Sequence, residues 1–344
     1  MFSTQSFDNY NIPENLKPTL AAMSNASIAQ STWSTYRTSL NKLRQFSQDT
    51  QIQTNLPLPN EVGLAFVAWL LDSGLSAATV DSYISGIKQV HLAAGLNPPD
   101  LRTPLVSTVI KGKRNLDNND KRAGNKTTRI PITPNMLRYL KTFLKKSEHS
   151  SHDKNLLWAT VTTCFSGGLR CGEILCRKKH KYDPDTDMLN KYLKITTLSD
   201  TSEIEIVQLT LRSEKQNQSG TPTVLDIYPS SSSLCPVRSV KKWRQSVTDT
   251  PDSLPAFRWE DGSNLTAREL NQFLKSALQP FLEGTNKTVS GHSLRIGLTS
   301  CLGSLGFSEE EIMSAGRWSS RAYKSYLQLP RTRRLEMARA IAKL

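Results

Sequence analysis

The chain has 344 residues, of which 44 are Lys or Arg and 30 are Asp or Glu, so its formal net charge is +14. A hydrophobic content of 37% is sufficient for folded cores and excludes a globally disordered chain. The length predicts two domains of ordinary size, and the positive charge predicts a polyanionic partner, either nucleic acid or an anionic membrane surface.

The sequence disfavours membrane insertion and secretion. Its longest apolar run, residues 62–71, is ten residues long, whereas a membrane-spanning helix needs about 20. The first residues, MFSTQSFDNYN, lack the basic and apolar regions of a signal peptide. The five cysteines are odd in number and form no CxxC pair. We therefore expect free thiols in a reducing intracellular compartment, without disulfides or a zinc site.

The first third of the chain predicts a compact helical domain. Residues 1–20 contain Asn, Pro and Ser without periodicity, and we expect them to form a loose arm. Apolar residues then recur at helical spacing in four successive segments. Asn60 and Ser76 are candidate N-caps of the second and third helices, and Thr103-Pro104 opens a short fourth helix. The predicted all-α bundle spans residues 21–115.

A basic segment follows this bundle. Residues 111–133, KGKRNLDNNDKRAGNKTTRIPIT, contain seven Lys or Arg residues and almost nothing to bury. We predict a linker over residues 116–132 whose charge suits contact with DNA phosphates. The alternatives are a solvated basic tether and a weak nuclear-import signal.

Residues 133–344 predict a second, mostly helical domain with a small antiparallel sheet inserted in it. The expected helices begin at Thr133-Pro134, flank Gly167-Gly168, and continue over 236–245, 266–282 and from 292 onward. Three strand-like runs cover 192–198, 203–211 and 223–228, and the second alternates clearly between apolar and polar residues. Ser308 with Glu311 is the signature of a capping box at the start of a further helix.

Four separated segments of this domain carry polar groups that a packed core does not require. SGGLRCGEIL places Arg170 directly after a Gly-Gly turn, and LRSEKQNQSG places Lys215 near the tip of a predicted hairpin. HSLR places His292 and Arg295 on one helical face, and GRWSSRAYKSYL supplies Trp318 and two tyrosines.

Each of these residues also has an ordinary structural explanation. Arg170 could pair with a carboxylate, Lys215 could be an exposed turn lysine, and His292 could cap its helix. An aromatic side chain near a helix end usually packs. The joint occurrence of the four segments, in this order, is what favours a functional interpretation.

The set resembles the tyrosine recombinases, the class that includes phage integrases, over about residues 26–344. Within that class, HSLRIG followed by GRWSSRAYKSYL, together with RWEDGSNLT at 258–266, looks most like the recombinases of eukaryotic mobile elements of the DIRS, Ngaro and Crypton types. The resemblance implies that residues 21–115 are a helical core-binding, SAM-like domain that contacts DNA. It implies that residues 133–344 are the catalytic domain.

The resemblance also implies residue roles. The implied catalytic residues are Arg170, Lys215, His292, Arg295, Trp318 and Tyr326. Glu173 matches the acidic residue that braces the first arginine, and Trp318 stands where the family more often has His. Tyr323 competes with Tyr326 as nucleophile because Trp318 precedes Tyr326 by eight residues, whereas nine is the commoner spacing. Arg212 likewise competes with Lys215, because both lie near the hairpin.

These residue types suit attack on a phosphodiester. Guanidiniums hold the non-bridging oxygens, and a phenol with a pKa of about 10 needs a base or a cationic field to attack. His292 would accept that proton, Lys215 would protonate the leaving 5′-oxygen, and the Trp318 indole would donate a hydrogen bond. The product would be a 3′-phosphotyrosine, with no ATP, cofactor or metal required.

The implied function is site-specific DNA recombination or integration for a mobile element. The expected partners are double-stranded DNA and further copies of the chain, as a dimer on one site and a tetramer in the synapse, with no membrane. The expected location is intracellular, and nuclear in a eukaryotic host. A type IB topoisomerase-like relaxer and a non-catalytic DNA-binding protein are the alternatives. Residues 331–344 could form an amphipathic helix that docks on a neighbouring copy or packs on its own domain.

Overall fold

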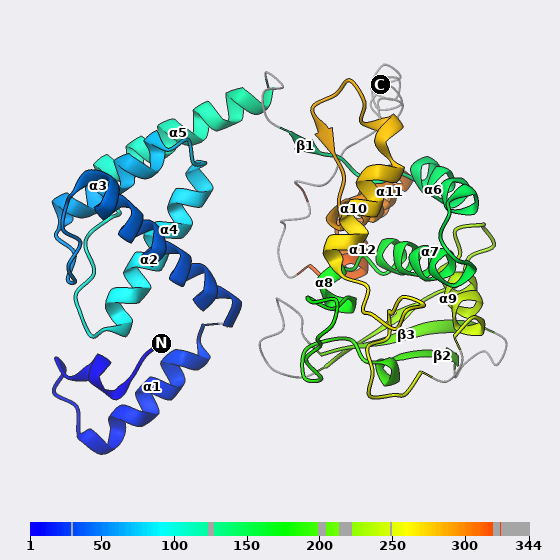
Figure 1. Cartoon of the computed structure of the whole chain (residues 1–344), viewed down its shortest axis with the longest axis horizontal. Coiled ribbons are helices and arrows are strands. Elements are labelled where there is room, and N and C mark those ends of the chain that lie inside the picture. Colours follow the sequence, from blue (N-terminus) through cyan, green and yellow to red (C-terminus); the bar gives the residue numbers. More distant parts are fainter. Residues whose placement is uncertain are drawn as a thin grey trace, which may run out of the picture. The chain divides into compact units, whose positions relative to one another are not determined.

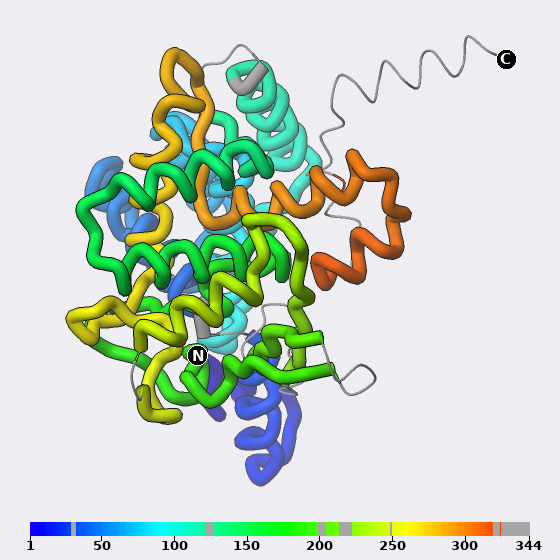
Figure 2. Tube along the Cα trace, turned by 90° about the vertical axis from the view of Figure 1, so that its right-hand side faces the viewer, coloured from blue at the N-terminus to red at the C-terminus, as the bar shows by residue number. Residues whose placement is uncertain are grey.

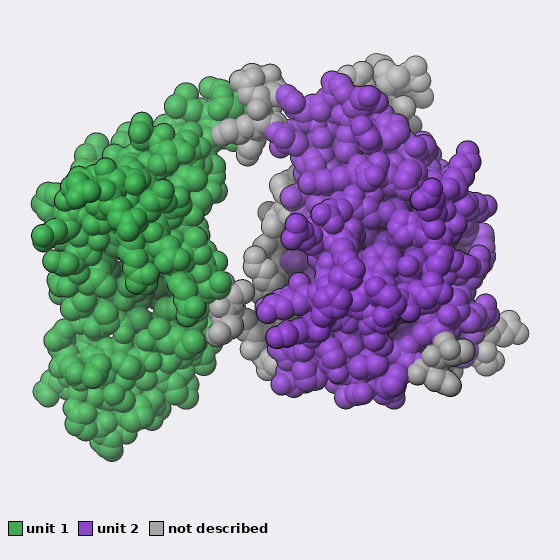
Figure 3. All heavy atoms as spheres, viewed as in Figure 1, with its two compact units in different colours: residues 1–126 green, residues 127–344 purple. Residues whose placement is uncertain are grey.

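The computed structural model describes residues 1–28, 30–122, 127–198, 204–212, 222–247, 250–318 and 324 of the chain. The chain forms two compact units, Met1–Lys126 and Thr127–Leu344, which Figure 3 colours separately. Each unit has its own hydrophobic core. Among the helices in these ranges, none is both long enough and apolar enough to cross a bilayer.

Unit 1 is a bundle of α-helices (Figure 1). They are α1 (Lys17–Ala26), α2 (Gln30–Thr50), α3 (Asn60–Asp72), α4 (Ala77–Ala93) and α5 (Pro104–Arg122). Helix α4 lies at the centre, in contact with α2, α3 and α5. Its Val80 and Ile87 are fully buried, and the rings of Phe46 on α2 and Phe66 on α3 meet edge to face at 5.6 Å.

Two of the predicted helix starts in unit 1 are confirmed. Ser76 caps α4 by accepting a hydrogen bond from the Thr79 backbone N–H, and α5 begins at Pro104. Asn60 is not a cap, because it is the first residue of α3 and its side chain accepts instead from the Asp100 N–H at 2.8 Å.

Helix α5 is longer than predicted and occupies part of the segment 116–132 that the sequence marks as a linker. Its side chain Asp117 is buried, accepts a hydrogen bond from the Ala77 backbone N–H at 2.8 Å, and pairs with Lys113 at 3.3 Å. This carboxylate therefore fastens the second half of α5 to the start of α4, which explains why the helix does not stop earlier.

The N-terminal residues are not a loose arm. They form the 3₁₀-helices η1 (Thr4–Phe7) and η2 (Glu14–Leu16) and continue into α1. The backbone of Phe2 exchanges two hydrogen bonds with the Asn25 side chain, at 2.9 and 2.8 Å, and the Asn9 side chain donates to the Gly95 carbonyl at 2.6 Å. These contacts join residues far apart in the sequence, so periodicity could not reveal them.

Unit 2 is built around a central helix. Its helices are α6 (Pro134–Lys146), α7 (Ser151–Ser166), α8 (Cys171–Ile174), α9 (Pro236–Gln245), α10 (Ala267–Ala277), α11 (Gly291–Leu305) and α12 (Glu309–Gly316), with 3₁₀ turns at Asn190–Tyr192 and Gln279–Phe281. Every residue from Leu156 to Cys164 on α7 is buried, and α7 contacts α6, α9 and α11. Figures 1 and 2 both show α6, α7 and α9 side by side. The predicted caps at Thr133 and Ser308 are confirmed.

The predicted small antiparallel sheet is also confirmed. It has the order β2-β3-β4, formed by Leu193–Thr197, Glu205–Leu211 and Thr223–Ile227. Leu193 pairs with Leu209, and Val207 pairs with Ile227. Helix α9 packs on β3, and a separate short parallel pair joins β1 (Thr128–Arg129) to β5 (Lys287–Thr288). The fold class is therefore mainly α with a small antiparallel sheet.

Candidate active site

The Gly-Gly turn after α7 determines where Arg170 lies. Gly168 has φ +54°, a left-handed conformation that favours glycine, and a Cβ there would lie 3.4 Å from the Cα of Gly316. The chain then places Arg170 at the N-cap of α8. The turn thus brings the first predicted arginine beside the GRW segment that follows α12.

A close contact between the backbone of Gly291 and the side chain of Cys171 brings His292 to the same place. Gly291 is the first residue of α11, and a Cβ on it would lie 2.0 Å from the Cys171 sulfur at the start of α8. Only a hydrogen at position 291 permits this approach. Since Arg170 precedes Cys171 and His292 follows Gly291, the two predicted catalytic residues meet where α8 and α11 begin.

The carboxylate of Glu173 links two arginines. Glu173 is buried, and it accepts hydrogen bonds from the backbone N–H and the side chain of Arg170, both at 2.9 Å. Arg317 donates to its other side at 2.8 Å. The Arg170 side chain keeps 29% of its surface exposed. A buried carboxylate therefore orients Arg170 while leaving it accessible to a ligand.

Arg295 has a different environment from Arg170. It is only 1% exposed, and its two terminal nitrogens donate to the backbone carbonyls of Gly168 and Gly316. Its guanidinium also lies 4.5 Å from the centre of the Trp318 ring. Arg295 therefore joins the Gly-Gly turn to the end of α12, with Trp318 covering one of its faces.

His292 lies within the combined field of three arginines. Burial, followed by the nearby charges of Arg129, Arg295 and Arg170, lowers the pKa of His292 from 6.5 to about 4. The imidazole is therefore neutral at pH 7, and it is a weaker base than an ordinary histidine. The guanidiniums of Arg129, Arg295 and Arg170 are therefore all close enough to this imidazole to lower its pKa.

The remaining predicted site residues lie outside the described residues. These are Lys215, Tyr323 and Tyr326. Between the two tyrosines, Lys324 pairs with Glu309 at the start of α12, with 2.6 Å between nitrogen and oxygen. Arg212, the competitor of Lys215, donates to the Pro184 carbonyl at 2.9 Å and lies over the Tyr192 ring at 5.4 Å.

Two residues of the site were not singled out from the sequence. Arg129, expected in the linker, lies instead on β1, and three residues later Ile132 donates to the Ser293 carbonyl at 2.9 Å. Arg317 has φ +52°, caps α12 and contacts Glu173. The alternation in RIPIT, residues 129–133, is typical of a strand and could have indicated that Arg129 lies on one. Nothing in the GRW segment itself indicates that Arg317 contacts Glu173. In the described part of the chain, no three His, Cys, Asp or Glu side chains gather as a metal site.

Comparison with known proteins identifies the fold. The sequence profile of the phage integrase N-terminal SAM-like domain matches residues 21–94, which lie in unit 1. The structure resembles a XerH site-specific recombinase bound to its palindromic difH substrate in a post-cleavage complex, with a TM-score of 0.57 and 16% identity, covering 90% of this chain and 80% of that one. Comparison with curated protein sequences gave no match.

Two further solved structures agree with this likeness. The Tn1549 transposon integrase in complex with transposon right end DNA has a TM-score of 0.54 and 15% identity, covering 91% of this chain and 94% of that chain. A lambda integrase dimer bound to a COC′ core site has a TM-score of 0.53 and 13% identity, covering 91% and 76%. The chain thus has a SAM-like N-terminal domain and a tyrosine-recombinase-like fold.

Proposed function

We propose that the protein is a site-specific DNA recombinase or integrase that cuts and rejoins strands through a 3′-phosphotyrosine. The observation that carries the proposal is the meeting of Arg170, His292 and Arg295 where α8 and α11 begin. These residues come from two segments more than a hundred positions apart. They converge in a chain whose fold is that of the tyrosine recombinases.

Arg170 and His292 are the groups best placed to act on a phosphodiester directly. The partly exposed guanidinium of Arg170 binds a non-bridging oxygen through charge-assisted hydrogen bonds. His292 is neutral at pH 7 and accepts the phenolic proton of Tyr326 when the negative charge of the bound phosphate offsets the arginine charges that lower its pKa. The phenolic oxygen bonds to phosphorus as the bond to the 5′-oxygen breaks, and Lys215 supplies the proton for that oxygen.

Arg295 contributes to the site from a buried position. Its bonds to the carbonyls of Gly168 and Gly316 hold the Arg170 turn against the segment that leads to the tyrosines. Its charge also stabilises the negative charge that develops on the phosphate. Trp318 covers this guanidinium and, having no acceptor nitrogen, cannot act as a base.

The proposed partners follow from this chemistry. Double-stranded DNA is the substrate, and the chain charge of +14 favours its binding. We infer assembly as a dimer on each site and a tetramer in the synapse, because rejoining to another strand requires two duplexes. The resemblance of the HSLRIG and GRW segments supports a mobile element of the DIRS, Ngaro or Crypton type, with action inside the cell and in the nucleus of a eukaryotic host.

A covalent adduct tests the proposal. Nicked duplexes of randomised sequence should trap the chain on DNA, because loss of a short cleaved fragment prevents rejoining. We expect the adduct to disappear in Tyr326→Phe and to persist in Tyr323→Phe. The reverse pattern would transfer the nucleophile to Tyr323. The absence of an adduct from the unmodified chain and from both variants, over DNA that the chain binds, would refute the proposed reaction.

One observation favours a second function, that of a DNA-binding protein without catalysis. Arg295 is almost wholly buried, with both terminal nitrogens bonded to backbone carbonyls, as in a structural arginine. The adduct assay separates the two functions, since binding alone requires no nucleophile. Transfer of a strand to a second duplex would further distinguish a recombinase from a topoisomerase-like relaxer.

A further inference from the structure

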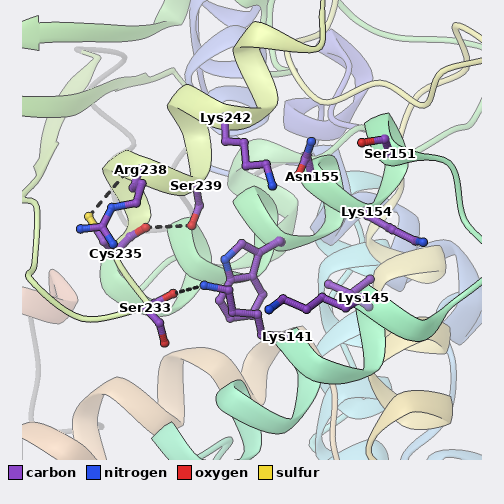
Figure 4. Close-up of a pocket in the computed structure, with 12 residues that line it drawn as sticks. Lys141, Lys145, Ser151, Lys154, Asn155, Ser233, Cys235, Arg238, Ser239 and Lys242 are labelled. Atoms are coloured by element: carbon purple, nitrogen blue, oxygen red, sulfur yellow. Dashed lines mark hydrogen bonds between the residues drawn. The ribbon is translucent and has the colours of Figure 1, made fainter.

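A basic recess lies between α6, α7 and α9, apart from the candidate active site. This α6–α7–α9 pocket has a volume of about 300 Å³. Five cationic side chains line it: Lys141, Lys145, Lys154, Arg238 and Lys242. Figure 4 shows Lys145 and Lys242 reaching toward the same central space from different helices, whereas Lys154 points away. Among the described residues that line the pocket, none is Asp or Glu.

The charges of the pocket are close enough to act on one another. Burial is the main cause that lowers the pKa of Lys141, and the neighbouring charges of Lys145, Arg238 and Lys242 lower it further. Within the described part of the chain, none of the five cations pairs with a carboxylate at salt-bridge distance. An anionic ligand would therefore relieve repulsion that the fold itself leaves in place.

Two buried apolar residues also line the pocket. Leu144 is 3% and Trp158 is 9% exposed. The Lys141 ammonium lies 5.5 Å from the centre of the Trp158 ring and donates to the Ser233 carbonyl at 2.7 Å, so two contacts hold this cation at the pocket (Figure 4). Helix α9 also begins here, with Cys235 as its N-cap, and the positive end of its dipole adds to the field.

We propose that the α6–α7–α9 pocket binds a small polyphosphate, a ligand with two or more linked phosphate groups. A terminal phosphate carries a charge of about −1.5 to −2 at neutral pH, so Lys141 and the three cations that lower its pKa match more than one such group. The volume lies at the lower end of the range for small-molecule sites. Duplex DNA spreads single charges along a strand, whereas these cations gather around one recess of about 300 Å³.

The site goes beyond the proposed recombination chemistry. The pocket uses the first half of α7, up to Trp158, whereas Arg170 follows the end of that helix at Ser166. At a rise of about 1.5 Å per residue, the eight steps from Trp158 to Ser166 span about 12 Å. Failure of one proposal therefore leaves the other unaffected, since the adduct assay and ligand titration depend on separate residues.

Calorimetric titration of the full chain tests the site. We expect both inorganic triphosphate and ATP to bind, with at least about tenfold weaker binding in Lys141→Ala and in Lys242→Ala. Lys146→Ala is the matched control, because Lys146 is exposed on α6 beside Lys145 but does not line the pocket. Equal affinity for the two ligands would identify the phosphate chain as the recognised part, and tighter binding of ATP would identify a nucleotide.

Other results would overturn the proposal. These are the absence of binding to both ligands, or an equal loss of affinity in Lys146→Ala. A third is a loss of duplex DNA affinity in Lys242→Ala with unchanged triphosphate affinity, which would make the pocket part of the DNA-binding surface. Unchanged thermal unfolding of each variant ensures that the comparison concerns folded protein.

Discussion

The candidate active site and the α6–α7–α9 pocket both concentrate positive charge in unit 2, but their surroundings differ. In the candidate active site, Glu173 bonds to Arg170 and Arg317, and backbone carbonyls bind Arg295. In the pocket, Lys141 bonds to one carbonyl, and no carboxylate is among the described lining residues.

The two sites differ in what the fold fixes. In the candidate active site it fixes the orientation of the guanidiniums, whereas in the pocket it only concentrates positive charge. Bonded guanidiniums keep one orientation, which chemistry at a single phosphorus atom requires. Long lysine side chains with few partners supply field strength and adapt to the ligand. Substitutions in the candidate active site should therefore affect stability and chemistry together, whereas substitutions in the pocket should affect only affinity.

The largest expected effect is that of Arg295→Ala. Its removal leaves the carbonyls of Gly168 and Gly316 without these donors and should lower the free energy of unfolding by about 2–4 kcal/mol. DNA cleavage should fall about 100-fold or more. Arg170→Ala is the matched variant, because Glu173 keeps its bond to Arg317 when Arg170 is removed. This variant should also lose DNA cleavage, but its free energy of unfolding should fall by only about 1 kcal/mol. Chemical denaturation and the adduct assay measure both quantities, and equal stability losses would contradict the distinction.

Gly316→Ala should have the next largest effect. A Cβ at Gly316 would lie 1.6 Å from the Trp318 ring, so the ring that covers Arg295 has to move. Overpacking of this kind costs about 1–3 kcal/mol in the free energy of unfolding. Gly172→Ala, on α8 with nothing within 4 Å of its Cβ, is the control and should be neutral or slightly stabilising. A Gly316→Ala melting temperature equal to that of the control would disprove the close packing.

The pH dependence of stability should reveal His292. Its pKa in the folded chain is about 4, below its ordinary value of 6.5, so the unfolded chain binds more protons between these values. The contribution of His292 to the free energy of unfolding should be fully present above pH 6.5 and should decrease as the pH falls toward 4. Below pH 4 this contribution should no longer change. His292→Gln should reduce the slope between pH 4 and 6.5. Denaturant titrations at several pH values measure the slope, and identical slopes in the two chains would contradict a lowered pKa of His292 in the folded state.

The smallest expected effect is that of Lys242→Ala in the pocket. The side chain is exposed and joins no ion pair with the described residues, so the free energy of unfolding should change by less than about 0.5 kcal/mol. Removal of one like charge should raise the pKa of Lys141, since Lys242 is among the causes that lower it. Thermal unfolding checks the first expectation and NMR titration of Lys141 the second. A large loss of stability would show that the pocket is structural.

The site could be predicted from the sequence only in part. The joint occurrence of the motifs, and the family that they resemble, indicated Arg170, His292 and Arg295, and the structure brings these three near one another. The inward orientation of Arg295 was not predictable, because it depends on carbonyls at positions 168 and 316. The same holds for Arg317, whose partner Glu173 lies 144 positions earlier in the chain.

The sequence by itself determined the elements whose causes are local. Helical spacing, the caps at Ser76, Thr133 and Ser308, and the alternation of β3 each depend on residues a few positions apart. Only the tertiary structure decided the ordered N-terminus, the length of α5 and the convergence of the arginines. The physical reason is that these features depend on hydrogen bonds and charges between distant segments, which form only when the cores have packed.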